Sequence, residues 1–243
     1  MDEEHKKHFR MSLAGHIIAL NIKYSSTYYF CREYLSNCEP EIEISITDSD
    51  LKFEKEKASE AGHSHDERYL ELMAVNRKIA EEMPAFDTLL MHGAVVAVGS
   101  DAYMFTANSG TGKTTHVRKW IDKDKSSFIL NGDKPLIKIT DSQVEACGTP
   151  WCGKERLGTN VMVPLKAIIL MERSEDNRIE RVAFDCIFPG LLAQTYHPKS
   201  SEKVRKTMSL LLQLNGKVDF YKYWFNNFKD DAFEVAHSAL IQK

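Results

Sequence analysis

Residues 107–114 carry the residue types that bind phosphate groups. They read Ala-Asn-Ser-Gly-Thr-Gly-Lys-Thr, which fits the phosphate-binding loop pattern with alanine where glycine is commoner. Gly110 and Gly112 let the backbone turn so that successive N–H groups point at phosphate oxygens. Lys113 supplies a mobile positive charge, and a helix that begins near it adds the positive end of its dipole. The expected nucleotide-binding residues are Ser109, Gly110, Thr111, Gly112, Lys113, Thr114 and Thr115.

Two oxygen-bearing side chains could hold magnesium beside this loop. Thr114 directly follows Lys113, and Mg²⁺ is a hard ion that is usually held by few protein oxygens plus the nucleotide. Asp133 follows the apolar run 127–130, at a strand end where α/β proteins collect their ligands. There it could hold the metal or take the proton from a nucleophile. The alternative is that Asn-Gly-Asp is an ordinary turn.

The segments around the loop have the patterns of strands and a helix. Residues 102–106 form an apolar strand that enters the loop, and residues 114–121 are compatible with a helix that leaves it. The alternative is a glycine-rich turn that merely joins a strand to a helix. Two hairpins are expected, one of 94–98 with 102–106 and one of 136–140 with 144–148. These elements predict an α/β fold with a mixed sheet around the phosphate-binding loop.

The N-terminal part of the chain predicts a smaller α+β portion. Strand-like alternation of apolar and polar residues occurs at 17–22 and 42–46. A helix is expected over residues 66–83, with Asp66 as its N-cap and Pro84 at its end. The charged run 51–60 is expected to be a solvated face or a loop. The pattern changes to short apolar runs after Pro84, so we predict two domains, residues 1–84 and 85–243.

Helical patterns are expected near the C-terminus. An apolar stripe at helical spacing is formed by Val204, Met208, Leu211 and Leu212. Residues 218–225 resemble a strand, and a final helix is expected over 230–241, with Asp231 and Glu234 in the positions of a capping box.

The composition excludes several classes of function. A net charge of −3 and a pI near 6.3 lack the basic surface that a nucleic-acid binder needs. The N-terminus is charged, and no apolar run is long enough to span a membrane, so we expect a cytoplasmic protein. Five cysteines without CxxC spacing argue against a disulfide framework or a zinc site. His63 and His65 could in principle bind a metal, but a short His-x-His in a polar loop is typical of solvated surface.

The chain resembles the catalytic domain of the HPr kinase/phosphorylase family. The resemblance rests on Met91-His92-Gly93, the first hairpin, Ser-Gly-Thr-Gly-Lys-Thr-Thr and the strand-end Asp133, and it covers residues 88 to about 171. The ATP-dependent phosphoenolpyruvate carboxykinases, which share that fold, are more distantly similar. The runs ANSGTGKTTH, NGDKP, GTPWCGKE and VPLKAI look like those of small, mostly uncharacterised bacterial proteins of the same fold.

The resemblance implies roles for individual residues. His92 matches the family's active-site histidine, Lys113 and Thr114 match its phosphate and metal contacts, and Asp133 matches one of its acids. HPr kinases usually have two adjacent aspartates at the strand end, whereas this chain has Gly132 before Asp133. One residue therefore cannot be assumed to serve both as metal ligand and as base. The alternative for His92 is a histidine packed on a strand with its hydrogen bonds satisfied.

Residues 148–160, which read GTPWCGKERLGTN, form a second unusual segment. Its glycines and proline constrain the backbone around Trp151, and Lys154 and Arg156 follow. Lys154 is the better candidate for a contact to the transferred phosphoryl group, because its ammonium reaches phosphate oxygens as a point charge. The alternative is a structural turn anchored by the tryptophan.

The sequence thus predicts an ATP- and Mg²⁺-dependent phosphotransferase that acts on a hydroxyl acceptor on a small molecule, a peptide or a protein. The expected catalytic residues are His92, Lys113, Asp133 and Lys154, and the expected metal ligands are Thr114 and Asp133. Two alternatives stay open. A carboxykinase is disfavoured because too little chain remains for a dicarboxylate-binding portion, and a nucleotide-binding sensor or assembly module without turnover is favoured by the missing second aspartate.

Overall fold

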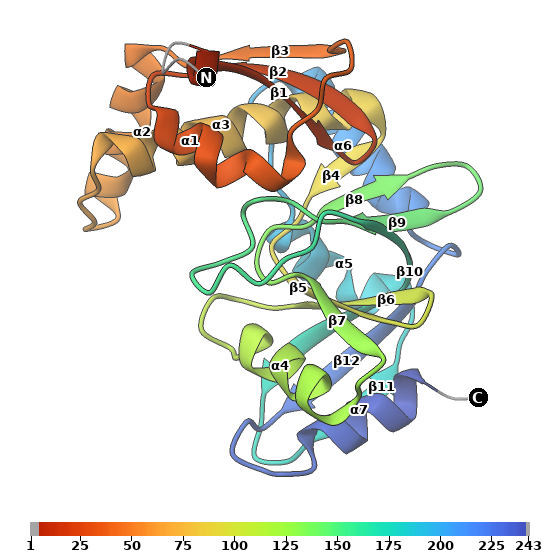
Figure 1. Ribbon diagram of the computed structural model, residues 1–243. Helices are drawn as coiled ribbons and strands as arrows, with labels where there is room; N and C mark the ends of the chain where they lie inside the picture. Colours follow the sequence, from red (N-terminus) through yellow and green to blue (C-terminus); the bar gives the residue numbers. More distant parts are fainter. Residues whose placement is uncertain (1–4, 242–243) are drawn as a thin grey trace. The chain divides into compact units, whose positions relative to one another are not determined.

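The computed structural model describes residues 5–241 (Figure 1). The chain separates into two compact units, Met1–Met83 and Pro84–Lys243. Within the described residues, no helix combines the length and the apolar character needed to cross a membrane.

The first unit contains a three-stranded sheet and helices. Strand β2 pairs antiparallel with β1 and parallel with β3. The short 3₁₀ segments are η1 (His5–Lys7) and η2 (Arg32–Tyr34). The strands and helices are β1 (His8–Leu13), β2 (His16–Asn21), α1 (Ser25–Cys31), β3 (Ile42–Ser45), α2 (Asp48–Glu60) and α3 (Glu67–Glu82). As predicted, α3 follows the N-cap Asp66, whose carboxylate accepts a hydrogen bond from the Tyr69 backbone N–H.

Residues 51–60, expected to be a solvated face or a loop, belong to helix α2. The helix begins at a capping box, in which the Thr47 hydroxyl and the Asp50 carboxylate each accept a hydrogen bond from the other residue's backbone N–H. Much of the helix is exposed, but Leu51, Glu54 and Ala58 are buried. The expected solvated face is present as the exposed side of this helix, and the loop alternative is wrong because Thr47 caps a helix here.

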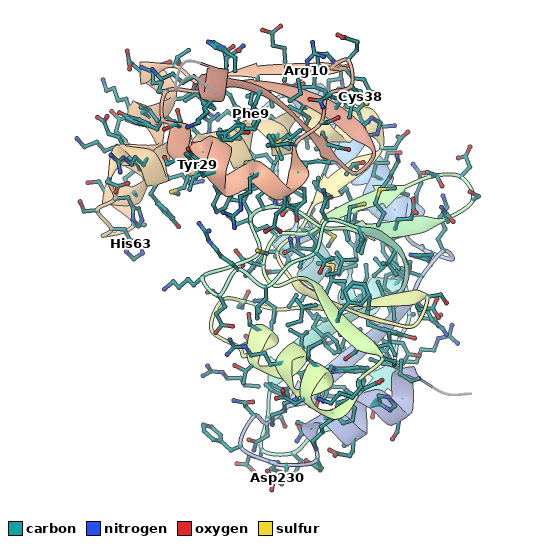
Figure 2. All side chains as sticks on the ribbon, viewed as in Figure 1. Phe9, Arg10, Tyr29, Cys38, His63 and Asp230 are labelled. Atoms are coloured by element: carbon teal, nitrogen blue, oxygen red, sulfur yellow. The ribbon has the colours of Figure 1, made fainter. Side chains whose placement is uncertain are left out.

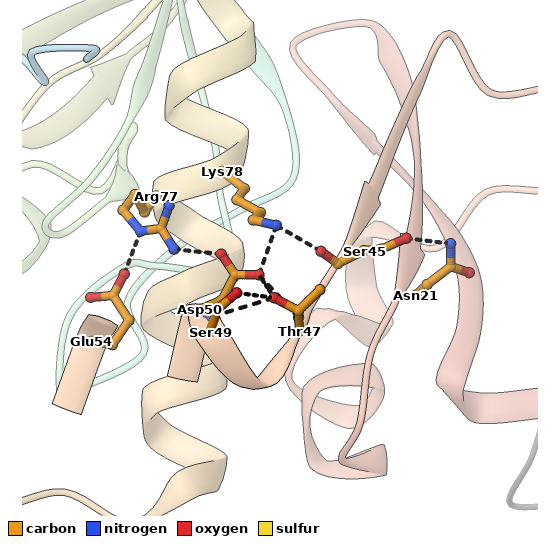
Figure 3. A network of polar contacts seen from close by, with 8 residues as sticks. All are labelled: Asn21, Ser45, Thr47, Ser49, Asp50, Glu54, Arg77 and Lys78. Carbon is orange, nitrogen blue, oxygen red and sulfur yellow. Dashed lines mark hydrogen bonds and ion pairs between the residues drawn. The ribbon is translucent and has the colours of Figure 1, made fainter. Parts of the chain in front are cut away.

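A charged network joins α2 to α3 (Figure 3). The Arg77 guanidinium lies 2.5 Å from the Glu54 carboxylate and 2.9 Å from that of Asp50. Lys78 Nζ lies 2.8 Å from Asp50 and also donates to the Ser45 carbonyl. Burial raises the pKa of Asp50, but the hydrogen bonds from Lys78, Thr47 and Arg77 outweigh burial and lower that pKa. The network therefore fixes the two helices against each other and against the end of β3.

The second unit is built on a 9-stranded mixed sheet. Its order is β4-β8-β9-β10-β6-β5-β7, with β12 paired to β10 and β11 paired to β12. The elements are β4 (Thr88–Leu90), β5 (Ala94–Val98), β6 (Asp101–Thr106), α4 (Lys113–Lys123), β7 (Ser127–Asn131), β8 (Leu136–Ile139), β9 (Val144–Cys147), β10 (Met162–Arg173), β11 (Arg178–Arg181), α5 (Phe184–Gln194), α6 (Ser201–Gln213), β12 (Asp219–Phe225) and α7 (Ala232–Leu240). The 3₁₀ segment η3 (Met83–Phe86) precedes β4. Both predicted hairpins are present, as β5–β6 and β8–β9.

Long strand β10 gives the sheet its curled, mixed character. Its first residues, from Met162 to Pro164, pair antiparallel with β9. From Leu165 onward it pairs parallel with β6 on one side, and from Ala167 onward it pairs parallel with β12 on the other. The unit is thus a mixed α/β structure in which β10 connects an antiparallel part to a parallel part.

Helices cover both faces of this sheet, and alternate strand residues point to each (Figure 1). Helices α4 and α7 pack in a core that includes Val96, Phe105 and Ile169. Helices α5 and α6 pack in a second core that includes Val95, Met104 and Ile168. Neighbouring positions along each strand therefore belong to different cores, as expected for strands buried on both sides.

Two details of the C-terminal helices differ from the expectation. In α6 the buried residues are Thr207, Leu210 and Leu211, whereas Leu212 is 54% exposed. Asp231 precedes α7 but makes no side-chain capping bond, so the predicted capping box is absent. Its carboxylate instead accepts a hydrogen bond from the Asn177 side chain at 2.7 Å, a tertiary contact that the sequence does not reveal.

His116 lies in the core behind the start of α4. It is fully buried, and its ring packs edge-on against Phe105, Tyr223 and Phe225. Its Nε2 accepts a hydrogen bond from the Trp120 indole N–H at 3.1 Å, while Nδ1 is buried without a hydrogen-bond partner among the described residues. Burial, helped by the positive charge of Lys119, lowers the pKa of His116 to about 3.

This burial makes the stability of the unit sensitive to acid. Unfolded histidine has a pKa of about 6.5, so below that pH the unfolded state binds a proton that the native state excludes. We expect His116 to reduce the free energy of unfolding by about 1.4 kcal/mol per pH unit as pH falls from about 6.5 towards 3. Urea unfolding at several pH values should show a shallower slope for His116→Phe, while the exposed-site control His197→Gln keeps the wild-type slope. Equal slopes for wild type and His116→Phe would contradict this role.

Candidate functional site

Strand directions bring three sequence-predicted segments to one edge of the sheet. Strand β6 runs into residues 107–112, which lead into α4. Because β5 is antiparallel to β6, its beginning, next to His92, lies at the same edge. Strand β7 is antiparallel to β5, and Asn131 at its end pairs with Val95. The turn that carries Asp133 therefore lies at this edge too. The Asp133 backbone carbonyl accepts a hydrogen bond from the Gly93 N–H at 2.8 Å.

The loop has the backbone conformation that its glycines favour. Gly110 and Gly112 have φ values of +79° and +111°, in the left-handed region. A Cβ on Gly112 would lie 2.9 Å from the Phe225 ring, so this glycine is also required for close packing. Helix α4 begins at Lys113 immediately afterwards. Ser109 and Thr115 are exposed and Thr111 and Thr114 are partly exposed, so these side chains can be reached from solvent.

Lys113 is folded back onto the loop. Its side chain is buried, and Nζ donates to the carbonyls of Ala107 at 2.9 Å and Asn108 at 3.2 Å. Burial lowers the pKa of Lys113, and the negative charge of Asp133 partly opposes that shift. The ammonium therefore lies under the loop with neutral carbonyl partners and one nearby carboxylate.

Asp133 and His92 form a pair across the edge. His92 Nε2 lies 3.4 Å from Asp133 Oδ1, and both side chains are about one-third exposed, at 31% and 35%. Burial raises the pKa of Asp133, but the hydrogen bond from His92 and the positive charges of Lys134, His92 and Lys113 outweigh it, so the pKa lies below its usual value. Asp133 is thus an ionised acid beside the buried lysine.

Gln194, at the end of α5, fixes the orientation of the His92 ring. Its Nε2 donates to Asn108 Oδ1 at 3.1 Å, so its Oε1, 2.8 Å from His92 Nδ1, is the acceptor in that contact. The Gln194 carbonyl also accepts the His92 backbone N–H at 2.7 Å. The network therefore makes Nδ1 the donor to Gln194, and Nε2 faces the Asp133 carboxylate.

The turn that presents Asp133 is held by Asn131. The Asn131 side-chain oxygen accepts the backbone N–H groups of Asp133 and Lys134, at 2.9 and 2.8 Å. Its amide nitrogen donates to Thr149, and both residues are buried. Asn131 therefore acts as a structural residue that orients the acid.

Gly132 explains why this edge has a single aspartate. A Cβ at this position would lie 2.7 Å from the Cys152 carbonyl and 3.3 Å from the Leu157 carbonyl. Both contacts are with backbone, which cannot move aside as a flexible side chain can. A second aspartate therefore does not fit here without displacing residues 148–160.

Residues 148–160 pack around the Asp133 turn, next to α4. The Trp151 carbonyl accepts a hydrogen bond from the Lys134 N–H at 3.1 Å. Gly153 lies close to Asp133, because a Cβ added to this glycine would be 3.5 Å from the Asp133 Cβ. Arg118 of α4 forms an ion pair with Glu155. Lys154 lies in this turn between Gly153 and Glu155 and is exposed to solvent. The segment is thus adjacent to the acid, with Lys154 on its solvent side.

Several side chains that contact the loop or His92 at this edge were not predicted from the sequence. Arg173, at the end of β10, donates to the Gly110 carbonyl and so contacts the loop directly. Gln194 and Asn108 bond each other and link the loop to His92. Arg173 and Gln194 are 63 and 86 residues away in sequence from their loop partners, Gly110 and Asn108. The parallel pairing of β10 with β6 puts the two strand ends side by side, and no local sequence pattern indicates that pairing.

Thr114 and Asp133 bring the oxygen donors that suit a magnesium ion. Thr114 Oγ1 lies 3.4 Å from the Gly132 carbonyl, so this hydroxyl is next to the residue that precedes Asp133. Among the described residues, no group of three or more His, Cys, Asp and Glu side chains could hold a metal by itself. A hydroxyl and a carboxylate are hard oxygen donors, and Mg²⁺ commonly completes its shell with phosphate oxygens and water.

Comparison with solved structures gives weak similarity, as one example shows. No known protein family matches the chain. No curated protein matches it either. The HPr(Ser) kinase/phosphatase from Coxiella burnetii is a solved structure that is similar over 62% of this chain and 95% of its own chain, with 9% sequence identity and a TM-score of 0.38. Similarity this weak carries no functional argument, so the proposal that follows rests on the residues of this chain.

The packing at Gly132 can be tested by adding a single methyl group. We expect Gly132→Ala to lower the free energy of unfolding by roughly 1–3 kcal/mol, because the new Cβ meets immobile carbonyls. Gly190→Ala is the matched control, since its Cβ would meet the flexible Leu170 side chain. Denaturant unfolding of both variants measures the difference. A Gly132→Ala protein as stable as wild type would show that the segment yields and that packing at Cβ does not exclude a side chain here.

Proposed function

We propose that the protein binds ATP with Mg²⁺ and transfers a phosphoryl group to a hydroxyl acceptor. The supporting observation is the convergence of a strand–loop–helix carrying Lys113 with the His92–Asp133 pair at one sheet edge. The loop N–H groups and the Lys113 ammonium would hold the nucleotide phosphates. Phosphate oxygens would then replace the carbonyls of Ala107 and Asn108 as partners of the ammonium. The nucleotide contacts come from residues 109–115.

The His92–Asp133 pair supplies the proton chemistry in this proposal. In its neutral form, His92 takes the proton of the acceptor hydroxyl at Nε2, because Nδ1 donates to Gln194 Oε1. The Asp133 carboxylate, 3.4 Å away, then stabilises the imidazolium. Thr114 and Asp133 are the proposed magnesium ligands, and the bound ion would neutralise charge on the terminal phosphates. In this proposal His92 accepts the proton and Asp133 binds the metal. Two adjacent acids would be another way to supply both roles.

Lys154 is proposed to act from the acceptor side. It is exposed in the turn whose neighbour Gly153 packs against Asp133. A cation there can strengthen its contact with the phosphoryl group as negative charge develops in the transition state. The acceptor would then lie between the loop and residues 148–160, with Trp151 in the same segment.

A second candidate is a nucleotide-binding sensor or assembly module without turnover. The close packing at Gly132 favours it, because the backbone leaves no room for a second acid beside Asp133. The two functions share the nucleotide site and differ in whether a phosphoryl group leaves the nucleotide. Measurement of ADP formation with a broad panel of hydroxyl acceptors separates them.

Binding is the first test of the proposal. With ATP and Mg²⁺ at about 100 times the dissociation constant, mass action stabilises the native state by about 2.7 kcal/mol, which thermal unfolding detects. We expect Lys113→Ala to abolish this stabilisation and to keep the unliganded fold. Lys125→Ala, an exposed lysine just after α4, is the matched control and should respond like wild type. Equal thermal shifts in wild type and Lys113→Ala would remove the nucleotide assignment.

Lys154→Ala extends the same measurement to the acceptor side. It should retain the nucleotide-dependent thermal shift, because its contact is proposed to form in the transition state. Once an acceptor is found, it should lose on the order of 10²-fold in turnover. Wild-type turnover of Lys154→Ala would make residues 148–160 structural.

Asp133→Asn tests the metal assignment. Removing the negative charge should weaken the magnesium affinity of the nucleotide complex by about tenfold or more, because a neutral amide is a poorer ligand for a hard cation. Asp141→Asn, in the exposed turn between β8 and β9, is the control and should leave that affinity unchanged. Titration of Mg²⁺ at fixed ATP, followed by thermal shift, measures it. Unchanged affinity in Asp133→Asn would exclude Asp133 from the metal site.

A further inference from the structure

The first unit contains a hollow that the proposed phosphotransfer does not use. It has a volume of about 340 Å³ and is lined by Lys7, Lys23, Tyr24, Ser25, Ser26, Tyr29 and Arg68. Tyr29 lies on α1 (Figure 2). All of these residues belong to Met1–Met83, and the volume is in the range of sites for small ligands. Among residues 5–241, the lining contains cations, hydroxyl groups and phenol rings but no carboxylate.

A buried carboxylate fixes the segment that forms one side of the hollow. Glu71 of α3 is fully buried. It accepts hydrogen bonds from the backbone N–H groups of Lys23 and Tyr24, at 2.6 and 3.2 Å, and from the Thr27 hydroxyl at 2.6 Å. With these donors satisfied, residues 23–27 are held in place before any ligand binds.

The positive charge of the lining is only partly neutralised. Lys23 pairs with Asp48, and the Tyr24 hydroxyl donates to Glu67. Lys7 and Arg68, in contrast, have no carboxylate partner anywhere within residues 5–241. The Lys7 backbone is fixed, because its carbonyl accepts the Ile22 N–H at 2.9 Å. Two unpaired cations therefore border a cavity without a lining acid, which favours an anionic ligand.

Ser26 adds an independent sign of a missing partner. Its hydroxyl oxygen is buried and makes no hydrogen bond with any of the described residues. Buried hydroxyl groups are nearly always hydrogen-bonded, so an unsatisfied one in the lining of a cavity calls for an explanation. Rotation about the Ser26 Cα–Cβ bond turns the hydroxyl without moving the backbone, so a ligand in the hollow can supply the partner.

We propose that this hollow binds a phosphate group, either free phosphate or the phosphate of a small ester. Lys7, Lys23 and Arg68 provide charge, and the serine hydroxyls provide further hydrogen-bond donors to its oxygens. In an ester, the organic part lies against the phenol rings of Tyr24 and Tyr29. The site is separate from the loop of residues 107–115 and does not depend on the proposed phosphotransfer.

The experiment uses the full chain carrying Lys113→Ala, so that phosphate does not bind at the loop. Inorganic phosphate, phenyl phosphate and benzoate are titrated at constant ionic strength, and backbone amide signals are followed by NMR. We expect saturable shifts at residues 23–29 with both phosphates, and weak or no shifts with benzoate. Tighter binding of phenyl phosphate identifies an ester as the ligand, and equal binding identifies free phosphate.

Variants in that background test the lining. Lys7→Ala and Arg68→Ala should each weaken phosphate binding roughly fivefold, the effect of losing one partly solvated charge contact. Ser26→Ala should weaken binding without lowering stability, because the hydroxyl has no protein partner to lose. Lys55→Ala, an exposed lysine of α2, should bind like the parent. Absence of saturable shifts, benzoate binding as tight as phenyl phosphate, or equal affinities in Lys7→Ala, Arg68→Ala and Lys55→Ala would overturn the proposal.

Discussion

The antiparallel pairing of β5 with both β6 and β7 determines where the reactive groups of this protein lie. If β5 ran parallel to β6, its beginning would lie at the opposite edge of the sheet, and a β7 antiparallel to it would end there too. With the observed pairing, His92, Lys113 and Asp133 share one edge although they come from three different segments. The parallel pairing of β6 with β10 adds Arg173 at the same edge, in contact with Gly110. The site is thus a consequence of sheet topology.

Charge at this edge is balanced across segments. A buried ammonium is costly unless it is solvated by dipoles or paired, and Lys113 has the carbonyls of Ala107 and Asn108 together with the nearby charge of Asp133. Asp133 in turn is surrounded by the positive groups that lower its pKa. An incoming polyphosphate would carry negative charge. Its oxygens would be stronger partners for the Lys113 ammonium than the neutral carbonyls that it contacts now. The arrangement is consistent with a site whose lysine changes partners when an anion binds.

Gly132 and Gln194 show how packing limits the chemistry available. Gly132 is enclosed by the backbone of Cys152 and Leu157, so the position next to Asp133 is closed to another acid. Gln194, at the end of α5, orients the His92 ring and connects it to the loop through Asn108. His92 and Asp133 are the histidine and the acid that this packing places side by side at the edge. Their placement depends on contacts that span several elements.

The sequence by itself determined the local parts of this structure. The strand–loop–helix around residues 107–115, both hairpins and the N-cap at Asp66 follow from glycine conformation, strand periodicity and capping, which act over a few residues. The helix over 48–60 also had a local signal in Thr47 and Asp50, which was overlooked. Tertiary structure alone decided the contact of Asp133 with His92, the capture of Asp231 by Asn177 and the hollow lined by Lys7 and Arg68. These features join residues far apart in the chain, and their existence depends on strand direction and close packing, which no short window of sequence encodes.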